Sequence, residues 1–153
     1  MHETEALHIR RLTAEDLEPL HRLLSDPAVM RYLEPPFTRA QTEAFLKKAG
    51  MGREPLIWAV EDGLGFAGYV IYHPYDETSM ELGWVLASDR WGRGYALALT
   101  RQMICRAREN GRDAVIECHP QQAATRHIAE KLGFRPCGMD GGCCVYRLAG
   151  KNE

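Results

Sequence analysis

The chain has 153 residues, of which 45% are hydrophobic and 26% are charged, which are ordinary values for a soluble folded protein and exclude a disordered one. Its 19 basic and 21 acidic residues give a formal net charge of −2, which provides no broad positive surface for nucleic acid. No apolar run approaches the ~20 residues of a membrane helix, and positions 1–5 are acidic where a signal peptide is basic. We therefore expect a single domain over residues 1–153, located in the cytoplasm, with no nucleic-acid or membrane partner.

The cysteines are five in number, which is odd, and none are spaced in the C-x-x-C pattern of zinc sites. We expect reduced thiols that pack as small apolar residues, and no metal site.

The first third of the chain is expected to be mainly helical after one short strand. Thr13 followed by Asp16 is typical of a helix N-cap with an acid in the first turn, and Thr38 followed by Gln41 has the capping-box pattern. The expected elements are a strand in residues 7–12 and helices ending near positions 25, 33 and 49.

From residue 56 onward the pattern changes to short strands with turns between them, followed by alternating helices and strands. The expected strands are residues 56–60, 66–72, 80–86, 114–118 and 143–148. The expected helices are residues 93–110 and 122–132, and the expected turns are residues 62–63, 74–78 and 138–142. Short connections make the first three of these strands an antiparallel meander, so the sequence predicts an α/β (α+β) fold.

One glycine-containing loop stands between a strand and the longest helix. It reads Trp91-Gly92-Arg93-Gly94-Tyr95-Ala96, and we call residues 91–96 the glycine loop. Two glycines let the backbone approach an anion, the first helical turn offers free N–H groups, and the helix dipole favours negative charge. Arg90 and Arg93 can add side-chain donors. The loop is thus a candidate phosphate site, although two glycines also occur where a chain merely turns.

Two other phosphate-binding motifs do not fit this loop. A P-loop requires Gly-Lys-Ser/Thr after a longer spacer, and a dinucleotide fingerprint requires a further small residue within a parallel βαβ unit. Neither pattern is present around residues 91–96.

The glycine loop resembles the Q/R-x-x-G-x-G/A signature of the GNAT superfamily of N-acetyltransferases, with Trp91 where Gln or Arg is usual. A tryptophan there is typical of the branch similar to ribosomal-protein N-terminal acetyltransferases of the RimJ/RimL kind. Segments in the order of this branch extend the resemblance over about residues 7–148; among them are Phe66-Ala67-Gly68, Glu81-Leu82-Gly83-Trp84 and Glu130-Lys131-Leu132-Gly133-Phe134.

The resemblance implies a fold, a cofactor and a set of contacts. The fold is a mixed, mostly antiparallel sheet that splays between its fourth and fifth strands to admit the pantetheine arm, with helices on both faces. The cosubstrate is acetyl-CoA, without a metal, and the implied state is a monomer or homodimer. The implied cofactor contacts are Val85, Leu86, Arg90, Trp91, Gly92, Arg93, Gly94, Tyr95, Ala96 and Gln122.

Three positions depart from the family pattern on the helix of residues 122–132. Gln122 and Thr125 replace the usual Asn and Ser, and Ala129 stands where many relatives carry a tyrosine acid. The resemblance gives Thr125 a hydrogen bond to the departing sulfur, with capping or packing as the alternative.

Transfer from a thioester to an amine requires above all that the ammonium lose a proton, because a thiolate leaves readily at neutral pH. Glu81 is the best candidate base, since it lies in the strand that leads to the glycine loop; an ordinary strand carboxylate is the alternative. Glu117 and His119 are the next candidates, and an acyl-Cys118 route is disfavoured because no partner histidine can be assigned.

We therefore expect an enzyme that acetylates a primary amine, either a protein N-terminus or a small molecule, by direct attack on acetyl-CoA. The competing hypothesis is a non-catalytic acyl-CoA-binding regulatory domain, which the departures at Gln122, Thr125 and Ala129 would permit.

Overall fold

A computed structural model describes residues 7–150. These residues form a seven-stranded sheet in the order β1-β2-β3-β4-β5-β7-β6. The strands are β1 His8–Arg10, β2 Ile57–Asp62, β3 Gly65–Asp76, β4 Ser79–Leu86, β5 Asp113–Cys118, β6 Arg135–Asp140 and β7 Cys143–Leu148. The helices are α1 Leu17–Leu24, α2 Pro27–Met30, α3 Arg39–Phe45, α4 Tyr95–Glu109 and α5 Ala123–Lys131. The chain forms two compact units, and β3 and β4 each contribute to both.

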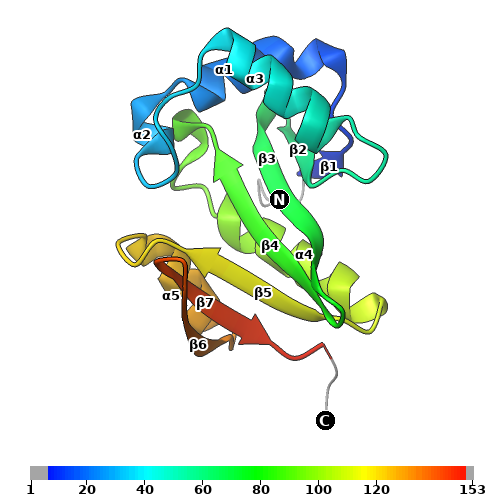
Figure 1. Cartoon of the computed structure of the whole chain (residues 1–153), viewed down its shortest axis with the longest axis vertical. Coiled ribbons are helices and arrows are strands. Elements are labelled where there is room, and N and C mark those ends of the chain that lie inside the picture. Colours follow the sequence, from blue (N-terminus) through cyan, green and yellow to red (C-terminus); the bar gives the residue numbers. More distant parts are fainter. Residues whose placement is uncertain (1–6, 151–153) are drawn as a thin grey trace. The chain divides into compact units, whose positions relative to one another are not determined.

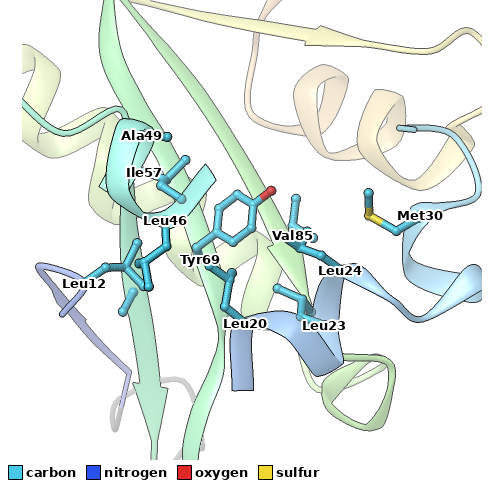
Figure 2. Close-up of a cluster of buried hydrophobic side chains, with 11 residues drawn as sticks. Leu12, Leu20, Leu23, Leu24, Met30, Leu46, Ala49, Ile57, Tyr69 and Val85 are labelled. Carbon is cyan, nitrogen blue, oxygen red and sulfur yellow. The ribbon is translucent and has the colours of Figure 1, made fainter. Parts of the chain in front are cut away.

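The N-terminal unit comprises residues 7–71 and 84–95. In it β1 and β2 pair antiparallel, as do β2 and β3, and helices α1 to α3 supply apolar side chains. Leu20, Leu23 and Leu24 recur at helical spacing on α1 and are at most 3% exposed. Figure 2 shows their cluster, with the ring of Tyr69 in the middle of the view. Each such buried leucine contributes about 1.5–3 kcal/mol to folding.

The expected N-caps are confirmed in this unit. The Thr38 hydroxyl accepts from the Gln41 backbone N–H at 3.1 Å, and the Gln41 side chain accepts from the Thr38 N–H at 2.8 Å. Thr13 and Asp16 form the same reciprocal arrangement at a short 3-10 helix just before α1. The capping groups thus satisfy backbone donors that the first helical turn leaves without partners.

The C-terminal unit comprises residues 72–83 and 96–150. Here β4 and β5 pair in parallel over three positions, from Ser79–Asp113 to Glu81–Val115. Beyond Val115, β5 continues to pair with β7 on its other side. The short parallel ladder agrees with a sheet that splays between its fourth and fifth strands. Figure 1 shows β7 next to β5, with β6 completing the hairpin.

Two expectations about strands were wrong. The turn expected at residues 74–78 is shorter, because β3 continues through Pro74 to Asp76. A strand at residues 135–140 was not expected, yet β6 lies there and pairs with β7. Every residue of β6 is exposed, and its sequence holds a proline and a glycine and lacks an apolar alternation. Edge strands tolerate such residues, which removes the pattern that predicts a strand.

The remaining helix and strand boundaries moved by one to three residues: α4 begins at Tyr95 instead of residue 93, and α2 ends at Met30 instead of near residue 33. The turn expected at residues 138–142 is shorter, because β6 continues to Asp140. Within residues 7–150, no helix has both the length and the apolar composition to cross a membrane.

Candidate active site

The glycine loop has the backbone geometry of an anion site. Gly92 and Gly94 have φ values of 78° and 80°, whereas Arg93 between them has a negative φ. Side chains are disfavoured at such positive φ, so both glycines are required by the conformation. A backbone whose φ changes sign from residue to residue can present successive N–H groups to one anion, as in anion-binding nests, and α4 begins directly after it. Residues 91–94 are exposed, and because the Trp91 N–H donates to the Ser88 carbonyl oxygen at 3.2 Å, the N–H groups from Gly92 onward are the candidates for an anion.

Trp91 ties this loop to the end of β4. Its indole Nε1–H donates to the Leu86 carbonyl oxygen at 3.0 Å, while about half of the residue, 52%, stays exposed. The residue that departs from the usual Gln or Arg therefore has a structural task. It fixes the position of the loop's first residue relative to the strand.

A close backbone contact lies beside the same strand end. Gly68 on β3 packs so tightly that a Cβ there would lie 2.2 Å from the Val85 carbonyl oxygen. The register of β2 and β3 shifts at this point, where Ala67 is the extra residue of a bulge. The predicted contact residues Val85 and Leu86 are both 6% exposed.

Asp62 at the end of β2 is a functional candidate that the sequence analysis missed. Its carboxylate accepts from the Arg90 guanidinium at 2.8 and 3.1 Å and from the Tyr95 hydroxyl at 2.8 Å. The Arg90 guanidinium, expected near the cofactor, is therefore engaged by Asp62. In the sequence, Asp62-Gly63 indicated only a turn. No sequence pattern links Asp62 to Arg90 and Tyr95, which lie 28 and 33 positions later.

The C-terminal unit holds a second group of polar side chains, His73, Tyr75, Glu81 and Glu117, which we call the carboxylate cluster. Residues 73 and 75 share one face of β3 because side chains alternate along a strand. Glu81 pairs with Val115 in the parallel ladder, and Glu117 lies two residues further on β5. The cluster thus comes from three strands, although only Glu81, Glu117 and the nearby His119 were singled out from the sequence.

Glu81 has the environment of a carboxyl that exchanges protons easily. Its side chain is 24% exposed, and its Oε1 lies 3.5 Å from the His73 Nε2. Burial raises the pKa of the Glu81 carboxyl above its usual value; His73 opposes this shift, and the Glu117 carboxylate adds to it. A carboxyl with a raised pKa is a stronger base at neutral pH than an ordinary one.

Glu117 and His119 are engaged in other interactions. The Tyr75 hydroxyl donates to the Glu117 Oε2 at 2.7 Å, and this hydrogen bond raises the pKa of Tyr75 to about 12. The His119 Nδ1 accepts from the Gln121 N–H at 3.1 Å, so the acceptor nitrogen of a neutral His119 ring is used within the chain. Both candidates thus already accept a hydrogen bond from within the chain.

The start of α5 carries the other predicted residues of this unit. Gln122 is the N-cap residue, and its side-chain oxygen accepts from the His119 N–H at 2.8 Å. Thr125 is half-buried on the first turn. Ala129 is fully buried, so the position where many relatives have a tyrosine is filled by a small core residue.

Cys118 is unsuited to nucleophilic attack. It is 4% exposed, and burial raises the pKa of its thiol to about 11, so little thiolate exists at neutral pH. All five cysteines are free thiols. Among the described residues, no three or more His, Cys, Asp or Glu side chains are grouped to hold a metal ion.

Comparisons with known proteins agree with this architecture. Residues 6–135 match the family model of the acetyltransferase (GNAT) domain. An uncharacterized N-acetyltransferase of Bacillus subtilis (strain 168), YnaD, is 28% identical over 147 residues, covering 92% of this chain and 85% of that protein. The crystal structure of a GNAT-family acetyltransferase from Bacillus anthracis has a TM-score of 0.80 at 25% identity, with 95% of each chain covered.

A third relative shows the same fold at lower identity. It is the spermidine N-acetyltransferase of Vibrio cholerae, solved with CoA and spermine, with a TM-score of 0.76, 22% identity and 94% coverage of each chain. The resemblance to the GNAT superfamily is confirmed, and the narrower likeness to the RimJ/RimL kind stays a prediction. On its family match and its relatives, the chain belongs to the GNAT acetyltransferases and is an acetyl-CoA dependent N-acetyltransferase.

Proposed function

We propose that the chain acetylates a primary amine by direct attack on acetyl-CoA, with the pyrophosphate on the glycine loop and Glu81 as the base. The observation that carries this proposal is the raised pKa of a half-buried carboxyl on β4, at the last residue of the short parallel ladder with β5. In the GNAT fold, the acetyl end of the cosubstrate lies where these strands diverge.

The backbone of residues 92–95 would hold the pyrophosphate, because φ alternates in sign along it and it leads into the start of α4, an arrangement that suits an anion with several acceptor oxygens. Ala96 adds no bulky side chain beside it. The β4 backbone at Val85 and Leu86 would position the pantetheine arm, and Gln122 would add a polar contact from α5. These contacts orient the thioester relative to the amine.

Acetyl-CoA supplies the acetyl group as a thioester, whose C–S bond breaks as the amine nitrogen forms the new C–N bond. Glu81 accepts the proton that the substrate ammonium must lose before its nitrogen has a free electron pair. Thr125 donates a hydrogen bond to the departing sulfur. Because a thiol has a pKa of ~8.5, the sulfur leaves as a thiolate, so a tyrosine acid at position 129 is dispensable. The nitrogen still carries one proton in excess after the C–N bond has formed; this proton goes to the thiolate, directly or through solvent, and Glu81 returns its own proton to solvent.

The other routes have weaker support. Glu117 accepts a short hydrogen bond from Tyr75, and His119 accepts one from Gln121. An acyl-enzyme on Cys118 would require a thiolate that its raised pKa disfavours.

The acceptor is either a protein N-terminus or a small-molecule amine. Relatives of the same fold point both ways: one is a spermidine N-acetyltransferase from Vibrio cholerae, and another is the ribosomal-protein-S18-alanine N-acetyltransferase of Escherichia coli. Both are under 25% identical to this chain, so they guide the choice of test compounds only.

The test is thiol release from acetyl-CoA in the presence of spermidine, spermine, amino acids and peptides with a free N-terminal alanine. Turnover with at least one primary amine, with the amide identified by mass spectrometry, supports the proposal. Tight CoA binding without turnover across the panel would instead support a non-catalytic regulatory domain.

A further inference from the structure

We propose that Asp62 is a positioning residue that holds the glycine loop in its anion-binding conformation and thereby makes the enzyme selective for donors that carry a pyrophosphate. This inference rests on the proposed function, because it assumes that the loop binds the cosubstrate. Asp62 itself is assigned no contact with the ligand.

The hydrogen bonds of Asp62 saturate its carboxylate. Oδ1 accepts from the Leu64 N–H at 2.9 Å and from the Arg90 Nη2 at 3.1 Å. Oδ2 accepts from the Arg90 Nε at 2.8 Å and from the Tyr95 hydroxyl at 2.8 Å. Each oxygen thus uses both of its lone pairs, which is the full capacity of a carboxylate. A group with no spare acceptor capacity is held in one orientation.

Two of these partners, Arg90 and Tyr95, flank residues 91–94 of the glycine loop. Arg90 directly precedes Trp91, and Tyr95 is the first residue of α4, so one carboxylate fixes the chain immediately before and after residues 91–94. The Asp62 and Arg90 side chains are 2% and 9% exposed, and Tyr95 is 3% exposed. Both attachment points are therefore buried, while residues 91–94 between them are exposed.

The loop needs such an anchor because its own sequence is permissive. Gly92 and Gly94 have access to many backbone conformations, and a Cβ at Gly92 would meet nothing within 4 Å. An unanchored loop would have to be ordered when the ligand binds, at the cost of conformational entropy. Asp62 holds both ends before binding, so the N–H groups of residues 92–95 are already aligned.

The buried Asp62 carboxylate of the anchor is paired with a cation. Hydrogen bonds from Arg90 hold the pKa of Asp62 well below its usual range, so the carboxylate stays ionised at working pH. The Arg90 guanidinium neutralises it, and the Asp89 carboxylate lies 3.0 Å from the same guanidinium at an exposed position. The buried charge of Asp62 is therefore compensated by Arg90, while the Asp89 carboxylate, whose side chain is 73% exposed, is solvated.

The experiment compares two donors, acetyl-CoA and S-acetylpantetheine, which share the thioester and differ in the pyrophosphate and nucleotide. The variants are Asp62→Asn, which weakens both attachments, and Tyr95→Phe, which removes only the hydroxyl. We expect kcat/KM with acetyl-CoA to fall about three- to tenfold in Tyr95→Phe. In Asp62→Asn it should fall on the order of 10- to 100-fold, the range for groups that orient binding residues without touching the ligand. The ratio of kcat/KM with acetyl-CoA to kcat/KM with S-acetylpantetheine should fall as well. The KM for acetyl-CoA should change more than kcat.

Two control variants separate positioning from general destabilisation. Asp16→Asn breaks another Asp–Arg pair, between the buried Asp16 and the partly exposed Arg10, and Tyr146→Phe removes a tyrosine hydroxyl that donates to Glu130. Both should lower thermal stability without changing the donor ratio. CoA binding to each variant is measured by calorimetry. If Asp62→Asn folds poorly, Tyr95→Phe remains as the test.

The outcomes are distinct. If the wild type binds no CoA, the proposed function fails whatever the variants do. If it binds CoA and both loop variants keep the wild-type affinity and donor ratio, the role of Asp62 is refuted and the proposed function stands. Equal losses with the two donors would reduce Asp62 to a structural residue and also overturn the inference.

Discussion

Asp62 in the N-terminal unit and Glu81 in the C-terminal unit are carboxylates in opposite environments. Asp62 is 2% exposed and accepts hydrogen bonds from Arg90 and Tyr95, which hold its pKa low. Glu81 is 24% exposed, faces a histidine at 3.5 Å and lies near the Glu117 carboxylate, and burial raises its pKa. The more deeply buried group is thus the more firmly ionised one.

The difference shows that partners outweigh burial in deciding what a carboxylate does. Burial alone disfavours the charged form, but charge-assisted hydrogen bonds that fill the acceptor sites reverse the balance. A saturated carboxylate such as Asp62 serves as a fixed anchor. A carboxyl such as Glu81, which is partly desolvated without a full set of donors, is suited to take up a proton.

The largest effect is expected from a substitution within the glycine loop, which Asp62 anchors. Gly94→Val places a branched side chain at φ 80° and would disturb the proposed N–H contacts to the pyrophosphate, each worth about 1.5–3 kcal/mol. We expect CoA affinity, measured by calorimetry, to fall on the order of 10³-fold, or about 4 kcal/mol. The matched control is Gly111→Val, which meets nothing within 4 Å and has a φ of 69°. Equal CoA affinity in the two variants would remove the loop from the cosubstrate site.

The second largest effect is expected for Glu81, the carboxyl that was compared with Asp62. Glu81→Gln keeps the shape and removes the proton acceptor, so we expect kcat to fall about 10²-fold, while CoA affinity changes little. Glu117→Gln is the control, because its carboxylate is engaged by Tyr75. Rates are to be measured over pH with amines of different pKa, which separates deprotonation of the amine from that of the enzyme. Wild-type rates for Glu81→Gln at every pH would return Glu81 to an ordinary strand carboxylate.

The third effect is on the pH dependence of the free energy of unfolding, to which Asp62 and Glu81 contribute with opposite signs. Each unit of pKa shift corresponds to about 1.4 kcal/mol. Because the folded pKa of Asp62 is lowered, its stabilisation is present above the ordinary aspartate pKa and is lost as pH falls toward the folded pKa. Because the folded pKa of Glu81 is raised, stability is lost as pH rises from the ordinary glutamate pKa to the raised one.

Denaturant unfolding from about pH 3 to about pH 8 tests both signs. Asp62→Asn should lose stability at neutral pH, and Glu81→Gln should equal or exceed the wild type there. A Glu81→Gln variant that is less stable than the wild type at neutral pH would contradict the raised pKa.

The smallest effect concerns a supporting contact in the carboxylate cluster. Tyr75→Phe removes the hydroxyl that donates to Glu117 at 2.7 Å, a bond worth about 0.5–1.5 kcal/mol. We expect at most a severalfold change in kcat, and a shifted pH profile, because a Glu117 carboxylate that no longer accepts from Tyr75 acts more strongly on Glu81. A loss as large as that of Glu81→Gln would mean that Tyr75 takes part in the chemistry directly.

Most of the fold could be predicted because its signals are local. The caps at Thr13 and Thr38, the leucines of α1 and the apolar runs of β2 and β4 each show within a few residues what they form. β6 could not be predicted, because this exposed edge strand forms by pairing with β7 and its own composition carries no strand pattern.

In the candidate site, the glycine loop could be recognised from the sequence, because the requirement for glycine at a positive φ is a property of single residues. The strand pattern also placed Glu81 in the strand that leads to the loop. In contrast, the hydrogen bonds from Arg90 and Tyr95 to Asp62 and the burial that raises the pKa of Glu81 follow from the folded arrangement alone. Both depend on which side chains the fold brings together, and the electrostatics of a carboxylate is set by those neighbours.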